Sequence, residues 1–187
     1  MNVLVVFDHP RRNSFCGAVL DRFVAGLQEA GHQAEIADLR AEGFDPRLGV
    51  EDEPDRDAPG KIYSPAVLAE QARVTRNDAL AFVFPVWWWS LPATSKGWID
   101  RVWNRDWAYG ARKLTHNKAL MIGLASADAG QYAKRSYDSA MQTQLVQGVL
   151  NYCGIADASL ELLHGSTGSE SSRSGLLERA TMLGRTF

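Results

Sequence analysis

The sequence predicts an α/β fold with five parallel strands in one sheet and helices on both faces. Apolar runs of strand length alternate along the chain with segments in which apolar residues recur at helical spacing. The first and third strand runs are almost entirely apolar, which is typical of strands covered on both faces. The chain has 187 residues, enough for one sizeable core. Together these features favour a parallel sheet within a single domain.

Periodicity and stop signals define the first elements. Residues 2–7 form an apolar, β-branched run that predicts a strand. Residues 14–30 carry apolar side chains at helical spacing, and Gly31 ends this predicted helix. Residues 33–39 predict a second strand. Residues 40–60 mix acidic residues, prolines and glycines without a period, so we expect a long loop of the functional or disordered kind.

The second half of the chain repeats this alternation. Pro85 ends a third apolar strand, and Pro92 stands in the first turn of a helix, where proline is tolerated. Five strands in this rhythm suit the flavodoxin-like order 2-1-3-4-5 better than a double dinucleotide-binding fold, which needs six. No repeat or linker divides residues 1–187, so we expect one flavodoxin-like domain. The predicted strands are 79–84, 118–124 and 158–163, and the predicted helices are 64–76, 91–103, 134–153 and 175–184.

Composition excludes several classes of protein. The formal net charge is -2 and the sequence pI is about 6.1, so the chain lacks the basic surface that nucleic acid requires. Cys16 and Cys153 lie far apart and the four histidines show no ligand spacing, so we expect neither a disulfide framework nor a metal site. The apolar start is too short for a signal peptide or a membrane span. We therefore expect a cytoplasmic protein without membrane insertion.

Known nucleotide and hydrolase motifs are absent from the sequence. No two glycines are spaced as GxG, so neither a GxGxxG fingerprint nor a Walker A loop exists. No GxSxG elbow occurs either. In an open parallel sheet, ligands bind beyond the carboxyl ends of the strands. The loops after the first, third and fourth strands are therefore the places to look for a site.

The loop after the first strand suits an anion. It leads into a helix whose free N–H groups and positive dipole end favour a phosphate, and His9, Asn13 and Ser14 add hydrogen-bonding side chains. Alternatively, Asn13 or Ser14 is only a helix cap and the neighbouring arginines are a solvated rim. Asp8 opposes a phosphate unless its carboxylate points away or pairs with an arginine.

The loop after the third strand holds three consecutive tryptophans between two prolines. Neighbouring loop residues leave the chain in different directions, so at least one ring should line an exposed concavity that covers a flat aromatic ligand. The prolines stiffen the backbone and hold its N–H groups in place. Alternatively, one or two rings fill the core or a subunit interface. The residues concerned are Pro85, Val86, Trp87, Trp88 and Trp89.

The loop after the fourth strand carries a weaker signal. Its small residues would let a planar ligand approach the backbone, and Tyr132 would offer a hydroxyl group. Taken alone, the segment also fits an ordinary surface loop. The residues concerned are Ala125, Ser126, Ala127 and Asp128.

Several blocks, in the right order, carry a family resemblance over nearly the whole chain. They are residues 9–15, 38–46, 84–93 with 96–102, 107–110, 153–154 and 164–165. With these blocks the sequence resembles the flavin-dependent NAD(P)H:quinone oxidoreductase family, a DT-diaphorase-like group with a flavodoxin-like fold. One segment departs from the family, which usually reads Thr-Thr-Gly-Gly where this chain has Ala125-Ser126-Ala127-Asp128. The change removes close backbone approach and adds a charge near the ring edge.

The resemblance implies a two-electron reduction of quinones or similar small acceptors by ping-pong hydride transfer through bound flavin. FMN is the expected cofactor, with FAD as the alternative, and NAD(P)H is the co-substrate. Ser14, Phe15 and Cys16 would hold the phosphate, and backbone donors of Trp87, Trp88 and Trp89 would face the ring. Tyr132 and Trp107 would border the acceptor pocket. The family also implies a homodimer.

Three other functions remain open at this stage. The first is a regulatory flavoprotein subunit of a potassium efflux antiporter, in which residues 40–60 would serve transporter docking or dimerisation. The second is a non-catalytic electron-carrier flavodoxin, although such carriers are usually strongly acidic and this chain is nearly neutral. The third is a relic of the fold that binds no flavin, because Asp8 and the Ala127-Asp128 change both oppose the ligand.

Overall fold

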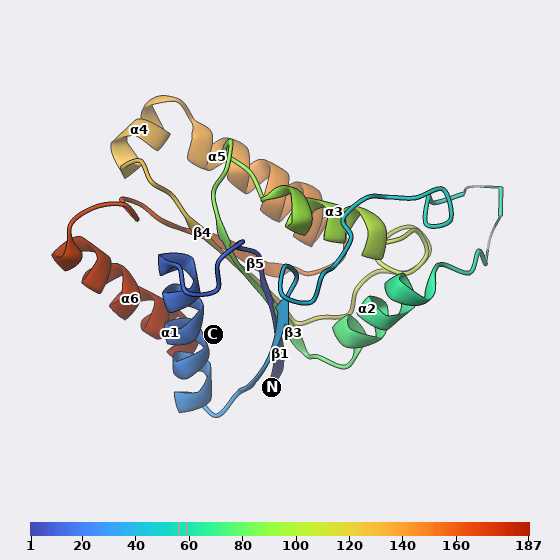
Figure 1. Cartoon of the computed structure of the whole chain (residues 1–187). Helices are drawn as coiled ribbons and strands as arrows, with labels where there is room; N and C mark the ends of the chain where they lie inside the picture. The colour runs from blue at the N-terminus through green and yellow to red at the C-terminus, as the bar shows by residue number, and fades with distance from the viewer. Residues whose placement is uncertain (56, 59) are drawn as a thin grey trace.

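Five parallel strands form the centre of the protein in a computed structural model that describes residues 1–55, 57–58 and 60–187 (Figure 1). Their order is β2-β1-β3-β4-β5, which confirms the predicted fold class and strand order. The inner strands β1, β3 and β4 are almost entirely apolar and buried because helices cover both faces of the sheet, whereas the edge strands β2 and β5 carry polar residues and are partly exposed. The strands are β1 Asn2–Phe7, β2 Gln33–Asp38, β3 Ala79–Pro85, β4 Lys118–Leu124 and β5 Asp157–Leu163.

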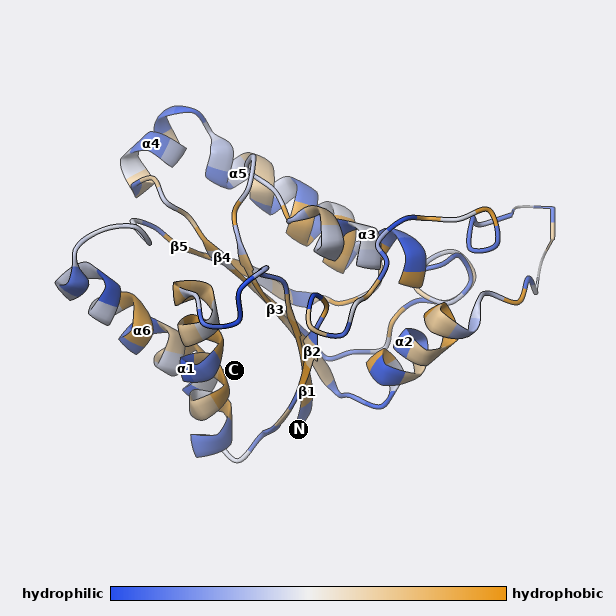
Figure 2. Ribbon diagram, in the orientation of Figure 1, coloured by the Kyte–Doolittle hydropathy of each residue, from blue (hydrophilic) through white to orange (hydrophobic). Residues whose placement is uncertain are grey.

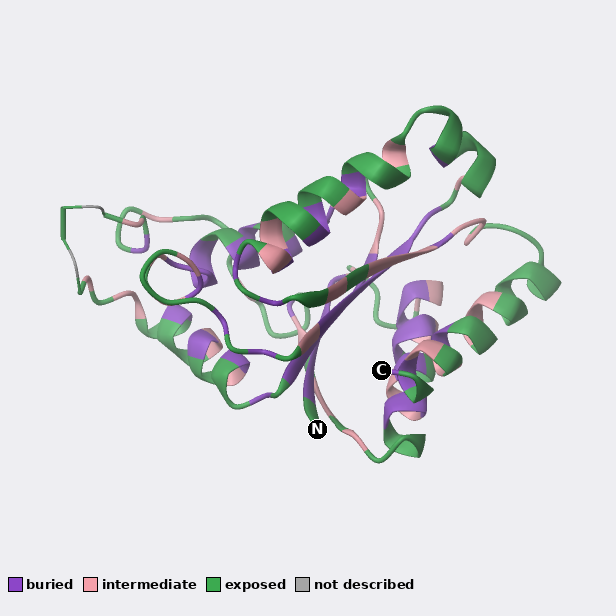
Figure 3. Cartoon of the chain, turned by 180° about the vertical axis from the view of Figure 1, so that it is seen from behind, coloured by how far each residue is buried: buried purple, intermediate pink, exposed green. Residues whose placement is uncertain are grey.

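Alternate strand residues point into two separate cores. Val3 and Val5 of β1 face the helices α1 Phe15–Glu29 and α6 Glu170–Arg185, whereas Leu4 and Val6 face the opposite layer. That layer contains α2 Pro65–Thr75 and α3 Ala93–Val102 (Figure 1). Figure 2 shows the apolar colouring concentrated on the strands and on the inner sides of the helices. Seen from behind, the helices are exposed on their outer sides, the inner strands are buried and the edge strand β5 is partly exposed (Figure 3).

Two glycines set the closest approach between α1 and α6. A Cβ atom on Gly184 would lie 2.2 Å from the Phe23 carbonyl oxygen, and one on Gly26 would lie 2.2 Å from the Thr181 carbonyl oxygen. Both obstacles are backbone atoms, which cannot rotate away. The two helices therefore pack at this distance only because both positions are glycine.

The single helix predicted for residues 134–153 is wrong in its detail. The chain forms α4 Ala129–Lys134, breaks at Ser136, and continues as α5 Tyr137–Met141 and the π-helical segment η1 Gln142–Asn151. Ser136 has φ 57, a left-handed conformation that ends α4. In η1 the Tyr152 N–H donates to the Gln147 carbonyl oxygen at 3.2 Å, the i→i−5 pattern of a π-helix. The closing helix also begins before the predicted residue 175, because Ser169 caps it.

Part of the predicted long loop is folded onto α3. The Asp52 carboxylate is fully buried and accepts hydrogen bonds from Arg101 at 2.8 Å and from the Ser64 N–H at 2.8 Å. Burial alone would raise the pKa of Asp52, but these donors outweigh it and lower that pKa. The loop also passes Gly97, where a Cβ atom would lie 2.3 Å from the Pro46 carbonyl oxygen. Positions 56 and 59 of this loop lie outside the described residues. In the part of the chain that the structure describes, no helix is long and apolar enough to cross a membrane.

Candidate active site

A cavity of about 290 Å³ opens at the carboxyl ends of the strands, as expected for an open parallel sheet. We call it the first cavity. Loops after β1, β3, β4 and β5 contribute to it. The predicted residues that line it are His9, Ser14, Phe15, Cys16, Pro85, Val86, Trp87 and Ser126, and the further lining residues are Arg11, Leu124, Ser166 and Thr167.

One end of the first cavity is the start of α1. The Ser14 hydroxyl caps this helix by accepting from the Gly17 N–H at 3.2 Å. The N–H groups of the first helical turn, beginning at Phe15 and Cys16, have no partner within the helix and carry its positive dipole end. Burial raises the pKa of the Cys16 thiol, which therefore stays neutral. Arg11 adds a cation, and among the residues that the structure describes no carboxylate lines the cavity, so this end suits an anion.

The Asp8 carboxylate points away from the first cavity and pairs with an arginine, which are the two conditions under which it is compatible with a nearby anion. Its carboxylate is fully buried, accepts from Arg40 Nε at 2.9 Å, and does not line the first cavity. It also accepts from the Ser95 N–H at 2.8 Å and the Ser95 hydroxyl at 2.9 Å. Pro92, the residue before α3, has no side-chain oxygen to cap the helix. The Asp8 carboxylate, far away in the sequence, caps it instead by accepting from the Ser95 N–H.

The tryptophan loop is a tight two-residue turn. The Trp87 N–H donates to Ser90 O at 3.3 Å, and the Ser90 N–H donates to Trp87 O at 3.1 Å. Between them Trp88 has φ 51 and Trp89 has φ 56. Positive φ at both central positions normally selects Asn or Gly, so two bulky residues store strain here. Strain of this kind is found at ligand sites more often than in plain turns.

None of the three tryptophan rings fills the core. Trp87 is 40% exposed and lines the first cavity beside His9, with the two ring centres 6.4 Å apart. Trp88 is 88% exposed. Trp89 stacks on Tyr137, with ring centres 4.2 Å apart and planes at 32°. The rings therefore line cavities or face solvent.

The loop after β4 divides its residues between two places. Ser126 lines the first cavity, whereas Ala125 is buried behind it. Asp128 caps α4 by accepting from the Gln131 N–H at 2.9 Å, and this hydrogen bond lowers the pKa of Asp128. The Asp128 carboxylate, expected to oppose a ligand, is therefore engaged as the cap of α4. Asn13, likewise predicted to bind a cofactor, is exposed and outside the cavity lining.

Sequence reasoning missed Ser166 and Thr167 as lining residues. They follow β5, and the Ser166 N–H donates to the Ala125 carbonyl oxygen at 3.0 Å, which ties the loops after β4 and β5 together. A signal did exist, because hydroxyl residues within a few positions of the end of a predicted strand lie near the ligand-binding edge of the sheet. Together they give the first cavity two more hydroxyl groups.

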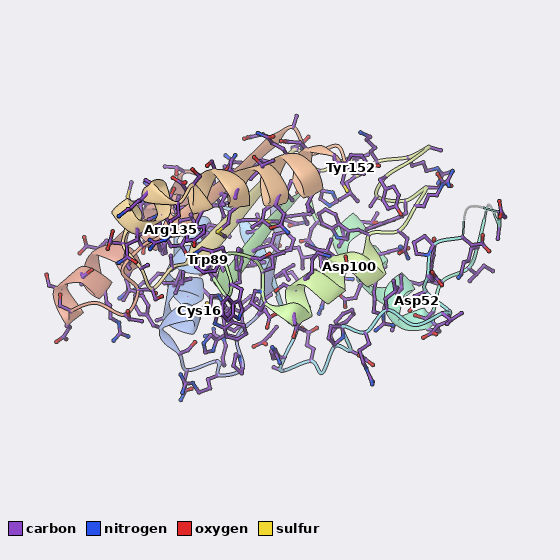
Figure 4. The ribbon with its side chains drawn as sticks, turned by 90° about the horizontal axis from the view of Figure 1, so that it is seen from above. Cys16, Asp52, Trp89, Asp100, Arg135 and Tyr152 are labelled. Atoms are coloured by element: carbon purple, nitrogen blue, oxygen red, sulfur yellow. The ribbon has the colours of Figure 1, made fainter. Side chains whose placement is uncertain are left out.

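A second cavity of about 310 Å³ lies on the other side of these loops. Trp87 and Ser126 line the first cavity while Trp89 and Ala127 line the second, so the two cavities share two loops. Figure 4 shows Trp89 and Arg135 at the same end of the molecule as Cys16. The residues that line the second cavity are Trp89, Ala127, Gln131, Tyr132, Arg135 and Tyr137.

The two predicted catalytic residues lie apart. Tyr132 lines the second cavity, where its ring packs edge-on against His164 with centres 4.7 Å apart. Burial raises the pKa of Tyr132, so its hydroxyl stays protonated at neutral pH. Trp107 lines a different cavity with Tyr63 and Arg105. The structure of one chain therefore does not bring Trp107 to Tyr132.

The fold defines a flavodoxin-like protein, and its first cavity, at the carboxyl edge of the sheet, has one end that suits an anion and one end lined by aromatic residues. A family model described as flavodoxin-like fold matches residues 1–182, and the chain belongs to this family. The resemblance found in the sequence is thereby confirmed.

Similar proteins carry related names. The chain is 35% identical over 162 residues to the uncharacterized NAD(P)H oxidoreductase YcaK of Escherichia coli, covering 86% of this chain and 82% of that protein. It is 26% identical over 186 residues to NAD(P)H dehydrogenase [quinone] 1 of Cavia porcellus, covering 87% and 68%. The solved NAD(P)H:quinone oxidoreductase from Methanothermobacter marburgensis has a TM-score of 0.94 and 34% identity, covering 100% of this chain and 96% of that one.

Proposed function

We propose that this protein is a flavin-dependent NAD(P)H:quinone oxidoreductase. The observation that carries the proposal is the first cavity, in which a helix N-terminus and an exposed tryptophan loop face the same space. Relatives and a solved structure with quinone oxidoreductase names support it. The net reaction converts NAD(P)H, a proton and a quinone into NAD(P)⁺ and a hydroquinone.

The residues present fit a flavin phosphate at the α1 end. The N–H groups of Phe15 and Cys16 would bind the phosphate oxygens, and Arg11 would add a positive charge. Arg12 does not compete for this role, because it pairs with Asp21 and donates to the Gly17 carbonyl oxygen at 3.2 Å. We infer that one phosphate is held at this helix start, which favours FMN over FAD.

The residues at the other end fit a flat ring. Trp87 and Val86 provide apolar surface. The N–H groups of Val86 and Trp87 already donate to Leu124 O and Ser90 O, so the expected Trp87 donor is not available to a ring. The N–H groups of Trp88 and Trp89, which the strained turn fixes, take this role instead. Ser126, Ser166 and Thr167 offer hydroxyl groups for a polar ring edge. When bound, the flavin supplies the chemistry of accepting a hydride and returning two electrons. The protein binds and orients the reactants and excludes water.

We propose that the acceptor binds in the neighbouring second cavity. We infer that Tyr132, protonated at neutral pH, offers its hydroxyl there as a hydrogen-bond donor. The ring of Trp88 is 88% exposed beside this site, and an exposed tryptophan is typical of a surface that a partner covers. We therefore propose a homodimer, in which the partner's loop with Trp107 completes the acceptor site. A cytoplasmic location remains part of this proposal.

The first test is the visible spectrum of the purified protein, followed by air-free addition of NADPH and then menadione. A yellow protein that is bleached by NADPH and recoloured by menadione is the expected result. Mass spectrometry of the released cofactor distinguishes FMN from FAD. A yellow protein that stays oxidised would favour the regulatory or electron-carrier alternatives. A colourless protein that neither flavin reconstitutes would overturn the proposal.

A further inference from the structure

We propose that the second cavity selects quinones that carry an anionic group, and that Arg135 is the residue that selects them. This inference rests on the proposed function, because it names the class of acceptor that the oxidoreductase takes. The anionic group, a carboxylate or a sulfonate on the ring, does not react. Arg135 is therefore a specificity-determining residue and takes no part in the electron transfer.

The position of Arg135 follows from the break between α4 and α5. Arg135 ends α4, and the left-handed Ser136 turns the chain so that Arg135 and Tyr137 line the same cavity. A left-handed serine costs about 1 kcal/mol or more, and such residues persist where their surroundings hold them. The left-handed turn at Ser136 thus places the Arg135 cation next to the Tyr137 ring.

The walls of the second cavity suit a flat ring. Trp89 and Tyr137 stack with ring centres 4.2 Å apart, and Tyr132 stands edge-on to Tyr137 with centres 6.0 Å apart. This cluster leaves a cavity of about 310 Å³, the size of a small bicyclic ligand. Aromatic walls recognise the quinone ring but do not distinguish a charged quinone from a neutral one.

Charge supplies that distinction. Arg135 is exposed. Within the described ranges 1–55, 57–58 and 60–187 it is the one cationic residue that lines this cavity, and no acidic residue lines it. Arg76 and Arg101 pair with carboxylates, but Arg135 pairs with none among the described residues. Of the two acids nearest in sequence, Asp138 accepts from the Ser139 N–H at 2.8 Å and lines a different cavity, and Asp128 accepts from the Gln131 N–H and side-chain amide. The guanidinium of Arg135 is therefore available, and its planar fork matches a carboxylate or sulfonate.

An anion held in this way is bound equally before and during the reaction, so it changes KM and leaves kcat unchanged. The test uses the flavin-loaded full chain with 1,4-naphthoquinone-2-sulfonate and with menadione, a neutral quinone of similar size. Arg135→Gln is expected to raise KM for the sulfonate about tenfold, which corresponds to about 1.4 kcal/mol. KM for menadione should change by less than about twofold, and Arg135→Lys should restore part of the loss.

Lys134→Gln is the matched control. Lys134 is the adjacent residue, is exposed, and does not line the cavity, so its removal changes the net charge equally. An equal effect of Lys134→Gln would show long-range attraction and overturn the assignment. Equal effects of Arg135→Gln on both quinones would overturn it as well, because they would show a loss of packing.

The donor also carries phosphates, so the anion must be traced to one reactant. NADH and uncharged N-benzyl-1,4-dihydronicotinamide are therefore compared as donors. If Arg135→Gln raises KM for NADH alone, the residue binds the donor phosphate and the inference is overturned. If the wild-type protein reduces no quinone, isothermal titration calorimetry still measures binding of the sulfonate. Weaker binding to Arg135→Gln would then support the anion subsite independently of the activity.

Discussion

Replacing Asp8 with alanine should both destabilise the fold and weaken flavin binding, because its carboxylate joins the loops after β1 and β2 to the start of α3. It follows β1 directly, accepts from Arg40 beyond β2, and caps α3 through Ser95. Since α3 begins just after the tryptophan loop, this cap fixes one end of that loop. The other end is fixed by the Val86 N–H, which donates to the Leu124 carbonyl oxygen at 2.9 Å.

The expected loss of unfolding free energy is about 3 kcal/mol. Alanine leaves the buried Ser95 N–H without an acceptor, which costs about 1–2 kcal/mol, and the Ser95 hydroxyl loses a bond worth about 1 kcal/mol. Arg40 is 39% exposed and is rehydrated, so its ion pair adds about 0.5–1 kcal/mol at most. Asp8→Asn keeps an acceptor for the Ser95 N–H and should lose about half as much.

Urea unfolding followed by tryptophan fluorescence measures the stability, and a flavin titration measures the dissociation constant. The midpoint should fall while the urea dependence stays unchanged. A double-mutant cycle with Arg40→Ala should give a coupling energy of about 0.5–1 kcal/mol. A loss below about 1 kcal/mol in Asp8→Ala would refute the stability estimate. A full loss with unchanged flavin affinity would show that Asp8 holds the fold but not the loops of the site.

Three other features lead to further predictions. Gly184→Ala should lower the unfolding free energy by more than about 2 kcal/mol, because its Cβ atom would lie 2.2 Å from the Phe23 carbonyl oxygen. The control is Gly175→Ala, where the Cβ atom would meet no atom within 4 Å; it should raise the unfolding free energy by about 0.5–1 kcal/mol. The hydrogen bond from Arg76 lowers the pKa of Glu35 to about 2, against an ordinary value of 4.5. The ionised Glu35 therefore stabilises the fold above pH 4.5, and this stabilisation is lost as the pH falls towards 2. Urea unfolding should show a loss of about 1 kcal/mol over this range, and Glu35→Gln should abolish the pH dependence. Trp88→Gly should leave the unfolding free energy unchanged within about 1 kcal/mol, because relief of the positive φ offsets the lost contact, while quinone reduction falls.

Much of the fold could be predicted from the sequence because the signals are local. A strand covered on both faces is apolar along its whole length, and the order of such runs leaves few topologies for a parallel sheet. The break at Ser136 could not be predicted in this way. The chain turns there with Tyr137 stacked on Trp89, a contact between residues far apart in the sequence. Apolar spacing across residues 134–153 therefore suggested one continuous helix.

Part of the candidate site could likewise be predicted from local signals, and part of it could not. Three of its loops were found because carboxyl ends of parallel strands meet at one edge, a rule that needs only the strand boundaries. The role of Asp8 depends on Arg40, 32 positions away, and on Ser95, 87 positions away. No local pattern contains those partners. The sequence could state only the condition under which Asp8 is compatible with a phosphate, and the structure then met it.

The tryptophan turn connects the stability of the fold to the proposed activity. Trp88 and Trp89 both have positive φ, at a cost of about 1 kcal/mol or more for each. Glycine or asparagine would form the same turn with less strain. Trp88 returns little of that energy, because 88% of it remains exposed. The fold tolerates the turn because Val86 anchors one end and Asp8 holds the helix start beyond the other. A strained, well-anchored turn that presents aromatic rings towards two neighbouring cavities is typical of a ligand site, and we therefore expect these rings to contact the ligands.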